Sequence, residues 1–301
     1  MNSLNPEYIA TELSLKILGS VQESITGIGF PGNHSGNMLC WAGSEDVLND
    51  FDSGYVIIHH SLEHLQEQYP NLCLLSTMEK PRLVYARAFH RFFHESAEPE
   101  NHVGIHRANP AINIGDYVFI GANVTIGPGT VIHSGSSILA GTQIGANCII
   151  RNNTSLGTEG LGLEFDHQLG RYIPFPQIGR VVLEDYVDIG PHSTARRAAM
   201  GTTLIGYGSK IGSFVNIGHN CSIGKHCILT SHVCLAGSVE VGDFAFISIG
   251  TTIRNKVSIT DHVVIGQGSV VTKSLSEPGT YYGHPAVKVA DSENKGSRDS
   301  Q

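Results

Sequence analysis

The sequence predicts a left-handed parallel β-helix preceded by a small α/β domain. Three observations carry this prediction: 35 glycines in 301 residues, a six-residue apolar period between residues 112 and 275, and no such period in the first hundred residues. A short repeat with many glycines is typical of solenoids, in which every repeat stacks on its neighbours.

The first run of the period contains eight apolar residues spaced six apart. They are Ile114, Ile120, Ile126, Ile132, Ile138, Ile144, Ile150 and Leu156. The second run contains twelve in unbroken register. They are Ile205, Ile211, Ile217, Ile223, Leu229, Leu235, Val241, Ile247, Ile253, Ile259, Ile265 and Val271. At 41% apolar residues, chance would produce twelve in a row on the order of once in 40,000 trials.

The positions two residues before each apolar residue are mostly small or β-branched, as a narrow interior requires. Three hexads make one triangular coil of about 18 residues, whose short strands pair in parallel with the next coil at roughly 4.8 Å. Cys148, Cys221 and Cys227 occupy these positions and are interpreted as interior fillers. Six scattered cysteines without a CxxC pair indicate reduced thiols rather than a disulfide framework or a cysteine zinc site.

The register breaks twice, at 157–177 and at 195–203. The first break carries the aromatic residues Phe165 and Tyr172, and loops that leave a solenoid usually lie on its binding face. Both aromatic residues are therefore candidate substrate-binding residues, although a neutral surface insertion is the alternative.

The domain organisation follows from these patterns. We expect a small α/β, nucleotide-binding-like domain at 1–100, a linker at 101–111, the β-helix at 112–275 with the inserted loop 157–177, and an exit segment with a disordered tail at 276–301. The first domain should contain helices at 6–18 and 81–94, each opened by a proline, and strands at 55–58 and 72–75.

Composition limits the partners. With 19 Lys and Arg against 27 Asp and Glu, the net charge is −8 and no basic run is present, so nucleic acid is not an expected partner. No signal peptide and no transmembrane segment are recognised, which favours a cytoplasmic location. His226 and His262, two coils and about 10 Å apart, cannot share a zinc ion, and we expect no metal site.

Four phrases of the chain resemble the UDP-3-O-acylglucosamine N-acyltransferases of lipid A biosynthesis. They are GTEGLGLEFDHQLGRYIPFPQIGRVVLEDYVDIG at 157–190, FVNIGHNCSIG at 214–224, SEPGTYYGHP at 276–285 and EKPRLVYARAFHRFF at 79–93. The resemblance runs over roughly residues 5–290 in the same domain order. It implies a homotrimer that transfers an acyl group from acyl carrier protein to the amine of a UDP-linked glucosamine, with no tightly bound cofactor.

The resemblance also assigns candidate site residues. The family's catalytic histidine falls on His219, whose near-neutral titration suits a general base, with Asn220 beside it in the IGHN phrase as a candidate substrate-binding residue. Gly237, one coil above, is the candidate whose N–H stabilises the oxyanion. Taken without the phrase and the inserted loop upstream, His219 is better interpreted as a polar residue at an outward-pointing turn of the coil.

Three positions depart from the family. Gly212 stands where the family has an acidic residue, and Lys256 stands where it has a second histidine. Lysine is a poor base at neutral pH but can bind an anion of the substrate. The aromatic residues that sandwich uracil fall near Cys40 and Asp46, with Trp41 displaced by one position, so Trp41 either stacks on the base or is core.

Two other functions therefore stay open. The exit phrase YYGHPAVKV resembles acetyl-CoA-dependent sugar-nucleotide acetyltransferases of surface-polysaccharide synthesis, and the family's C-terminal helices that bind carrier protein have no counterpart here. Acyl-CoA is thus an alternative donor to acyl carrier protein. The losses at Gly212 and Lys256 would also fit a non-catalytic trimeric scaffold.

Overall fold

The computed structural model describes residues 3–21, 23–31, 36–94, 102–104 and 109–291. The chain divides into two compact units, an N-terminal unit of Met1–Ala97 with Leu161–Pro176, and a β-helix unit of Glu98–Gly160 with Gln177–Gln301. Most of the expected tail (292–301) and five positions of the expected linker (101 and 105–108) lie outside the described residues. No helix of the described ranges has the length and apolar content needed to cross a bilayer.

The N-terminal unit is an α/β sheet with the strand order β1-β5-β4-β3-β2. Its elements in chain order are α1 Pro6–Glu12, β1 Lys16–Leu18, β2 Gly27–Ile28, β3 Met38–Trp41, α2 Glu45–Leu48, β4 Gly54–His59, the 3₁₀ helix η1 His60–Leu65, β5 Leu72–Thr77, α3 Pro81–Ala88 and the π-helical turn η2 Phe89–Phe93. The expected strands at 55–58 and 72–75 are confirmed as the cores of β4 and β5, and α3 with η2 covers the second expected helix.

The helix expected at 6–18 is shorter than predicted. Asn5 caps α1 by accepting from the backbone N–H groups of Glu7 and Tyr8, but the helix ends at Glu12. Ser14 then adopts a positive φ of 55°, which a right-handed helix cannot contain, and residues 16–18 pair antiparallel with β5 instead. Sheet pairing therefore overrides the continuous apolar pattern of this segment.

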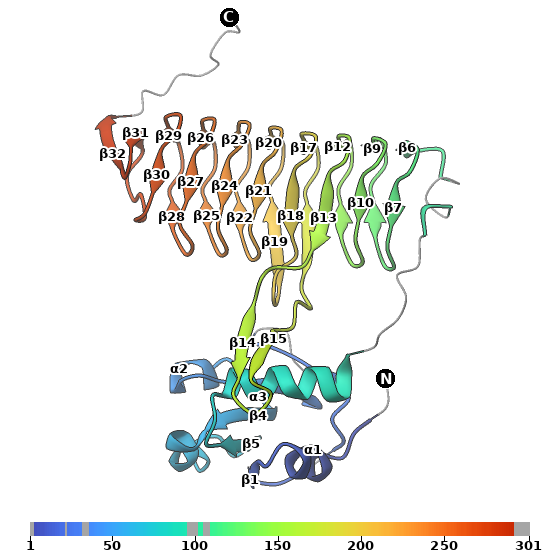
Figure 1. Ribbon diagram of the computed structural model, residues 1–301, viewed down its shortest axis with the longest axis vertical. Coiled ribbons are helices and arrows are strands. Elements are labelled where there is room, and N and C mark those ends of the chain that lie inside the picture. Colours follow the sequence, from blue (N-terminus) through green and yellow to red (C-terminus); the bar gives the residue numbers. More distant parts are fainter. Residues whose placement is uncertain (1–2, 22, 32–35, 95–101, 105–108, 292–301) are drawn as a thin grey trace, which may run out of the picture. The chain divides into compact units, whose positions relative to one another are not determined.

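The β-helix has three faces of stacked strands (Figure 1), all paired in parallel except β31 with β32 at the end of the third face, which are antiparallel. The first face holds β7 Phe119–Ile120, β10 Ser137–Ile138, β13 Ser155–Thr158, β18 Thr194–Arg196, β21 Asn216–Ile217, β24 Cys234–Leu235, β27 Thr252–Ile253 and β30 Val270–Val271. The second holds β8 Thr125–Ile126, β11 Gln143–Ile144, β16 Arg180–Leu183, β19 Thr202–Ile205, β22 Ser222–Ile223, β25 Glu240–Val241 and β28 Ser258–Ile259. The third holds β6 Asn113–Ile114, β9 Val131–Ile132, β12 Ile149–Ile150, β17 Asp188–Ile189, β20 Lys210–Ile211, β23 Ile228–Leu229, β26 Phe246–Ile247, β29 Val263–Ile265, β31 Gly279–Gly283 and β32 Ala286–Ala290.

The predicted hexad interior is confirmed. All twelve apolar residues of the second run are at most 4% exposed, and in the first run only Ile114 and Ile126 are partly exposed. The small residues two positions earlier are also buried, and hydroxyls among them bond to backbone carbonyls, as Thr130 does to Gly145 at 2.9 Å. Cys148, Cys221 and Cys227 are buried free thiols, and burial raises the pKa of Cys221 and of Cys227 to about 11.

The spacing between paired strands shows which coils contain the two register breaks, at 157–177 and 195–203. Ile120 pairs with Ile138 at the ordinary spacing of 18, whereas Ile144 pairs with Leu183, 39 positions later. Ala195 then pairs with Ile217, 22 positions later. The long insertion is therefore accommodated between two stacked coils, and the second break lengthens the coil that lies directly before Ile217.

The segment predicted as a surface loop of the β-helix at 157–177 contains a β-hairpin, β14 Leu163–Asp166 and β15 Arg171–Pro174. This hairpin packs with α3 and belongs to the N-terminal unit, not to the β-helix (Figure 1). Glu164 and Asp166 of β14 are buried, while Leu163 and Phe165 between them are exposed. Charged residues therefore face the unit's interior, which reverses the usual alternation of a strand.

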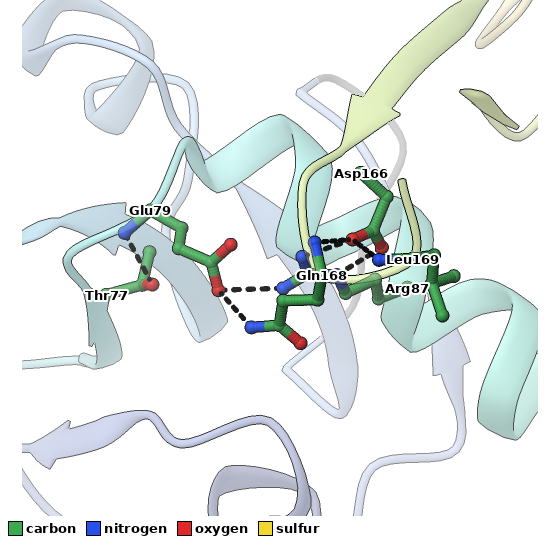
Figure 2. A network of polar contacts seen from close by, with 6 residues as sticks. All are labelled: Thr77, Glu79, Arg87, Asp166, Gln168 and Leu169. Atoms are coloured by element: carbon green, nitrogen blue, oxygen red, sulfur yellow. Dashed lines mark hydrogen bonds and ion pairs between the residues drawn. The ribbon is translucent and has the colours of Figure 1, made fainter. Parts of the chain in front are cut away.

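Ion pairs with α3 explain this reversal. Arg87 donates to both carboxylate oxygens of Asp166, at 2.7 and 2.8 Å, and to Glu79 at 2.7 Å (Figure 2). Asp166 Oδ1 also accepts from the N–H groups of Gln168 and Leu169 at the hairpin turn. The second buried carboxylate, Glu164, pairs with Lys80 at 2.9 Å and with Arg82.

Candidate functional site

His219 lies at the first turn after β21, half-buried between two glycines of neighbouring coils. A methyl group at Gly237 would lie 2.5 Å from Nε2 of the ring, and one at Gly160 would lie 2.9 Å from Cδ2. Either side chain would displace the imidazole, so both positions need glycine. Nε2 therefore lies directly beside the backbone of Gly237.

The hydrogen bonds of Gly237 leave its N–H available. Its carbonyl accepts from the Lys256 N–H at 3.1 Å, and the following residue, Ser238, donates to the carbonyl of His219 at 2.8 Å. Among the described residues no partner accepts from the Gly237 N–H. An unpaired backbone donor beside the histidine nitrogen is what oxyanion stabilisation in acyl transfer requires.

Asn220 contacts His219 and the backbone, which the sequence did not indicate. Its Oδ1 is 3.0 Å from His219 Nδ1 and accepts from the Ala199 N–H at 3.0 Å. Its Nδ2 donates to the Met200 carbonyl at 2.8 Å. The amide groups expected to contact substrate thus bond within the protein.

Gly212 leaves no room for an acidic residue. A methyl group there would lie 2.7 Å from the Ser231 nitrogen of the next coil, and the Gly212 carbonyl already accepts from Ser193 Oγ at 2.8 Å. A carboxylate at this position would need the stacked coils to separate.

Two arginines hold the segment that ends at Gly160. Arg197 donates to the carbonyls of Gly157 and Ala140, both at 2.8 Å, and Arg196 donates to the Glu159 carbonyl at 3.1 Å. Burial lowers the pKa of the Arg197 guanidinium. Sequence reasoning missed these residues and Gly160, although Arg196 and Arg197 occur in the break at 195–203, which was a visible signal.

Lys256 lies two coils beyond His219 on the same edge of the β-helix, with an exposed side chain and a positive φ of 59°. No carboxylate within the described ranges lies within ion-pair distance of its ammonium group. The site therefore carries a cation that is free to meet an anionic group of a substrate.

The other candidate residues lie in the N-terminal unit. Trp41 on β3 is half-buried and packs edge-on against Phe175, with ring centroids 6.3 Å apart. Its Nε1 is buried without a hydrogen-bond partner in the described part of the chain. Phe175 also has the Arg82 guanidinium 3.9 Å above its ring. Trp41 therefore packs against a residue of its own unit, and its stacking on a nucleotide base stays a prediction.

Phe165 and Tyr172 pair across the hairpin with ring centroids 5.2 Å apart, and they are 40% and 61% exposed. Both therefore present aromatic surface to solvent. The structure gathers His219, Asn220, Gly237 and Lys256 on the β-helix unit, and it gathers Trp41, Phe165 and Tyr172 on the N-terminal unit.

A cavity of about 640 Å³ opens in the N-terminal unit, and none of the candidate residues lines it. Its charged walls include Arg87 with Asp166 and Arg91 with Glu12, which are ion pairs. The stacked histidines of the β-helix also lack a metal geometry, because Phe244 lies between His226 and His262 with centroids 5.1 Å from each.

Comparison with known proteins finds similarity to hexapeptide-repeat transferases. The family described as bacterial transferase hexapeptide (six repeats) matches residues 123–158. The UDP-3-O-acylglucosamine N-acyltransferase of Janthinobacterium sp. (strain Marseille) is 37% identical over 150 residues, which cover 50% of this chain and 42% of the relative. A probable UDP-3-O-acylglucosamine N-acyltransferase 2, mitochondrial, of Arabidopsis thaliana is 36% identical over 146 residues, 48% of each chain.

The resemblance to the UDP-3-O-acylglucosamine N-acyltransferases is confirmed. The chain spans about half the length of the curated UDP-3-O-acylglucosamine N-acyltransferases that it matches. Among solved structures, the Francisella novicida UDP-N-acetylglucosamine acyltransferase superposes with a TM-score of 0.51 at 26% identity over 58% of this chain and 63% of that one. The UDP-N-acetylglucosamine O-acyltransferase of Moraxella catarrhalis has the same TM-score at 23% identity, over 60% and 70%, and shares the fold, a left-handed parallel β-helix.

Proposed function

We propose that the protein transfers an acyl group from a thioester donor to the amine of a UDP-linked amino sugar, as an N-acyltransferase of lipid A synthesis. The observation that carries this proposal is the arrangement of His219, whose Nε2 lies beside the backbone of Gly237, a residue whose N–H has no acceptor among the described residues. The names of the curated relatives support the same reaction.

The two groups fit the chemistry of amide formation. The sugar amine attacks the thioester carbonyl, the C–N bond forms, and the carbonyl oxygen becomes an oxyanion that the Gly237 N–H stabilises. His219 Nε2 takes the proton that the nitrogen must lose. The intermediate then collapses, the C–S bond breaks, and the thiolate takes the proton to leave as a thiol.

The charges and aromatic rings suggest how the substrates bind. The unpaired Lys256 ammonium suits a phosphate of the nucleotide or of the donor's pantetheine arm. Trp41, Phe165 and Tyr172 offer rings against which a uracil base or an acyl chain can pack. Acyl carrier protein is the donor proposed from the resemblance, and acyl-CoA is the alternative.

The proposal includes a homotrimer in which a neighbouring subunit completes the site. Exposed apolar side chains along the β-helix support an interface, since Phe214 is 52%, Phe244 51% and Ile249 48% exposed. Light scattering should give three times the 32.3 kDa chain mass, whereas a monomer at every concentration would contradict the assembly. The cytoplasmic location stays a prediction.

A mass-spectrometric transfer assay tests the function. UDP-amino sugars are combined with 3-hydroxyacyl carrier protein, long-chain acyl-CoA and acetyl-CoA, using the wild type, His219→Ala, and His133→Ala as a control at another half-buried histidine. We expect His219→Ala to lower kcat/KM by about 10²- to 10⁴-fold, because it removes the base, and His133→Ala to leave it unchanged.

The outcomes separate the remaining alternatives. Acyl transfer from carrier protein that His219→Ala abolishes supports the proposal, and transfer from acetyl-CoA alone would replace it with a sugar-nucleotide acetyltransferase. If no donor yields product from folded wild-type protein, the protein is not this enzyme and the scaffold interpretation replaces it.

A further inference from the structure

The orientation of the Asn220 side-chain amide is fixed by two backbone groups of opposite character. The Ala199 N–H can only donate, so the atom 3.0 Å from it must be the amide oxygen. The Met200 carbonyl can only accept, so the atom 2.8 Å from it must be the amide nitrogen. Exchanging the two atoms would break both hydrogen bonds.

This orientation determines the protonation of His219. Asn220 Oδ1 lies 3.0 Å from His219 Nδ1 and has no hydrogen to give, so Nδ1 must carry one. In the neutral ring the lone pair is then on Nε2. That is the nitrogen beside Gly237, where a general base for the proposed acyl transfer is needed.

The second register break supplies the backbone groups that hold Asn220. Residues 195–203 lengthen the preceding coil, since Ala195 pairs with Ile217 at a spacing of 22 rather than 18. Besides Ala199 and Met200, the segment provides Thr203, whose buried Oγ1 accepts the Asn220 N–H at 2.8 Å. Asn220 itself has a φ of 60°, a left-handed conformation that asparagine tolerates better than most residues.

We propose that Asn220 is the positioning residue of His219, and that the segment 195–203 holds its amide so that His219 is the Nδ1–H tautomer with its lone pair on Nε2. Gly212 has no side chain that could hold Nδ1 in this way. The effect on catalysis rests on the proposed function, whereas the tautomer can be measured without any turnover.

Nitrogen NMR of histidine-labelled protein tests the tautomer directly. His219→Ala assigns the His219 signals, and Asn123→Ala serves as a matched control, because Asn123 is also in the β-helix with a φ of 57°. We expect the Nδ1–H form in the wild type and in Asn123→Ala, and a shift toward the Nε2–H form in Asn220→Ala. An Nε2–H ring in the wild type, or an unchanged tautomer in folded Asn220→Ala, would overturn the proposal.

The separate effects on kcat and KM, and the pH dependence of kcat, provide a second test. A purely structural role of Asn220 would not produce these effects. Asn220→Ala should lower kcat about tenfold or more with little change in KM, because the base is misplaced while the substrate contacts remain. Asn220→Asp keeps an acceptor at Nδ1 and adds a negative charge beside the ring, so the acidic limb of the kcat profile should move to higher pH. If Asn220→Asp is active but the acidic limb of its kcat profile is unchanged, residue 220 does not contact His219 directly. If the wild type has no turnover, that result counts against the proposed function alone.

Discussion

The β-helix and the hairpin β14–β15 are both β structure, but their interiors are opposite in character. The β-helix buries rows of aliphatic residues such as Leu235 and Ile247, both 0% exposed. The hairpin buries the carboxylates of Glu164 and Asp166 and leaves Phe165 and Tyr172 in solvent. The hairpin buries one apolar residue, Ile173, and its two buried carboxylates depend on a few cations on α3 or directly before it, whereas the β-helix distributes its stabilisation over many equivalent residues.

This difference predicts different sensitivities. A buried ion pair is specific because one particular partner must be present, and losing that partner leaves a charge in a poorly solvated place. In a stacked apolar row, losing one side chain removes that residue's share of buried surface and leaves no charge unpaired. Substituting one ion-pair partner of the hairpin and one apolar residue of the β-helix should therefore distinguish the two kinds of interior.

The largest effect is expected for Arg87→Met. It leaves Asp166 buried without its cation, which should cost about 3–5 kcal/mol of unfolding free energy in the N-terminal unit. Trp41, the only tryptophan, packs against Phe175 in this unit, so its fluorescence during urea unfolding reports the change. Arg87→Met with Asp166→Asn should recover part of the loss, because the neutral amide oxygen can still accept from Gln168 and Leu169.

An equal loss in the single and double variants would show that the charge is not what makes Arg87 important. The comparison between the hairpin and the β-helix would then rest on packing in both units.

Leu235→Ala should have the next largest effect. It removes a buried side chain from the β-helix interior, and such truncations cost about 2–5 kcal/mol. The control Val289→Ala, at a residue 57% exposed on β32, should change stability by less than about 0.5 kcal/mol. Circular dichroism of the parallel strands measures both, and similar losses in the two variants would contradict an interior position for Leu235.

Which features of the fold and the candidate site can be predicted depends on how far apart in the sequence the contacting residues are, and on whether the contact is repeated. The hexads were found because each apolar residue contacts the equivalent residue about 18 positions away, and the same pattern recurs coil after coil. The same register predicts that Gly237, 18 positions after His219, lies beside it in the next coil, whereas the catalytic role of His219 stays a prediction. These are local and repeated signals, and one sequence contains them in full.

The hairpin and the role of Asn220 were not predicted for the opposite reason. The alternation of Leu163, Glu164, Phe165 and Asp166 suggests apolar residues inside. Only distant cations explain why the charges are buried: Arg87, 79 positions earlier, for Asp166, and Lys80 with Arg82 for Glu164. Likewise, nothing in the segment 195–203 indicates that its backbone bonds the Asn220 amide. Each of these contacts occurs once, so no repeat reveals it.

The smallest expected effect is on acid stability, where both partners remain and only their charge changes. Hydrogen bonds from Arg87 hold the pKa of Asp166 below its ordinary value of 3.8. A carboxylate with a lowered folded-state pKa stabilises the fold above the unfolded-state pKa, and this contribution is lost as the pH falls from near 4 toward the folded-state pKa. Trp41 fluorescence between pH 6 and pH 2 should therefore show the N-terminal unit of the wild type losing stability below pH 4. In Asp166→Asn this part of the pH dependence should be absent, at the cost of lower stability at pH 6, and an unchanged acid profile would mean that other carboxylates of the unit, such as Glu164, control its acid unfolding.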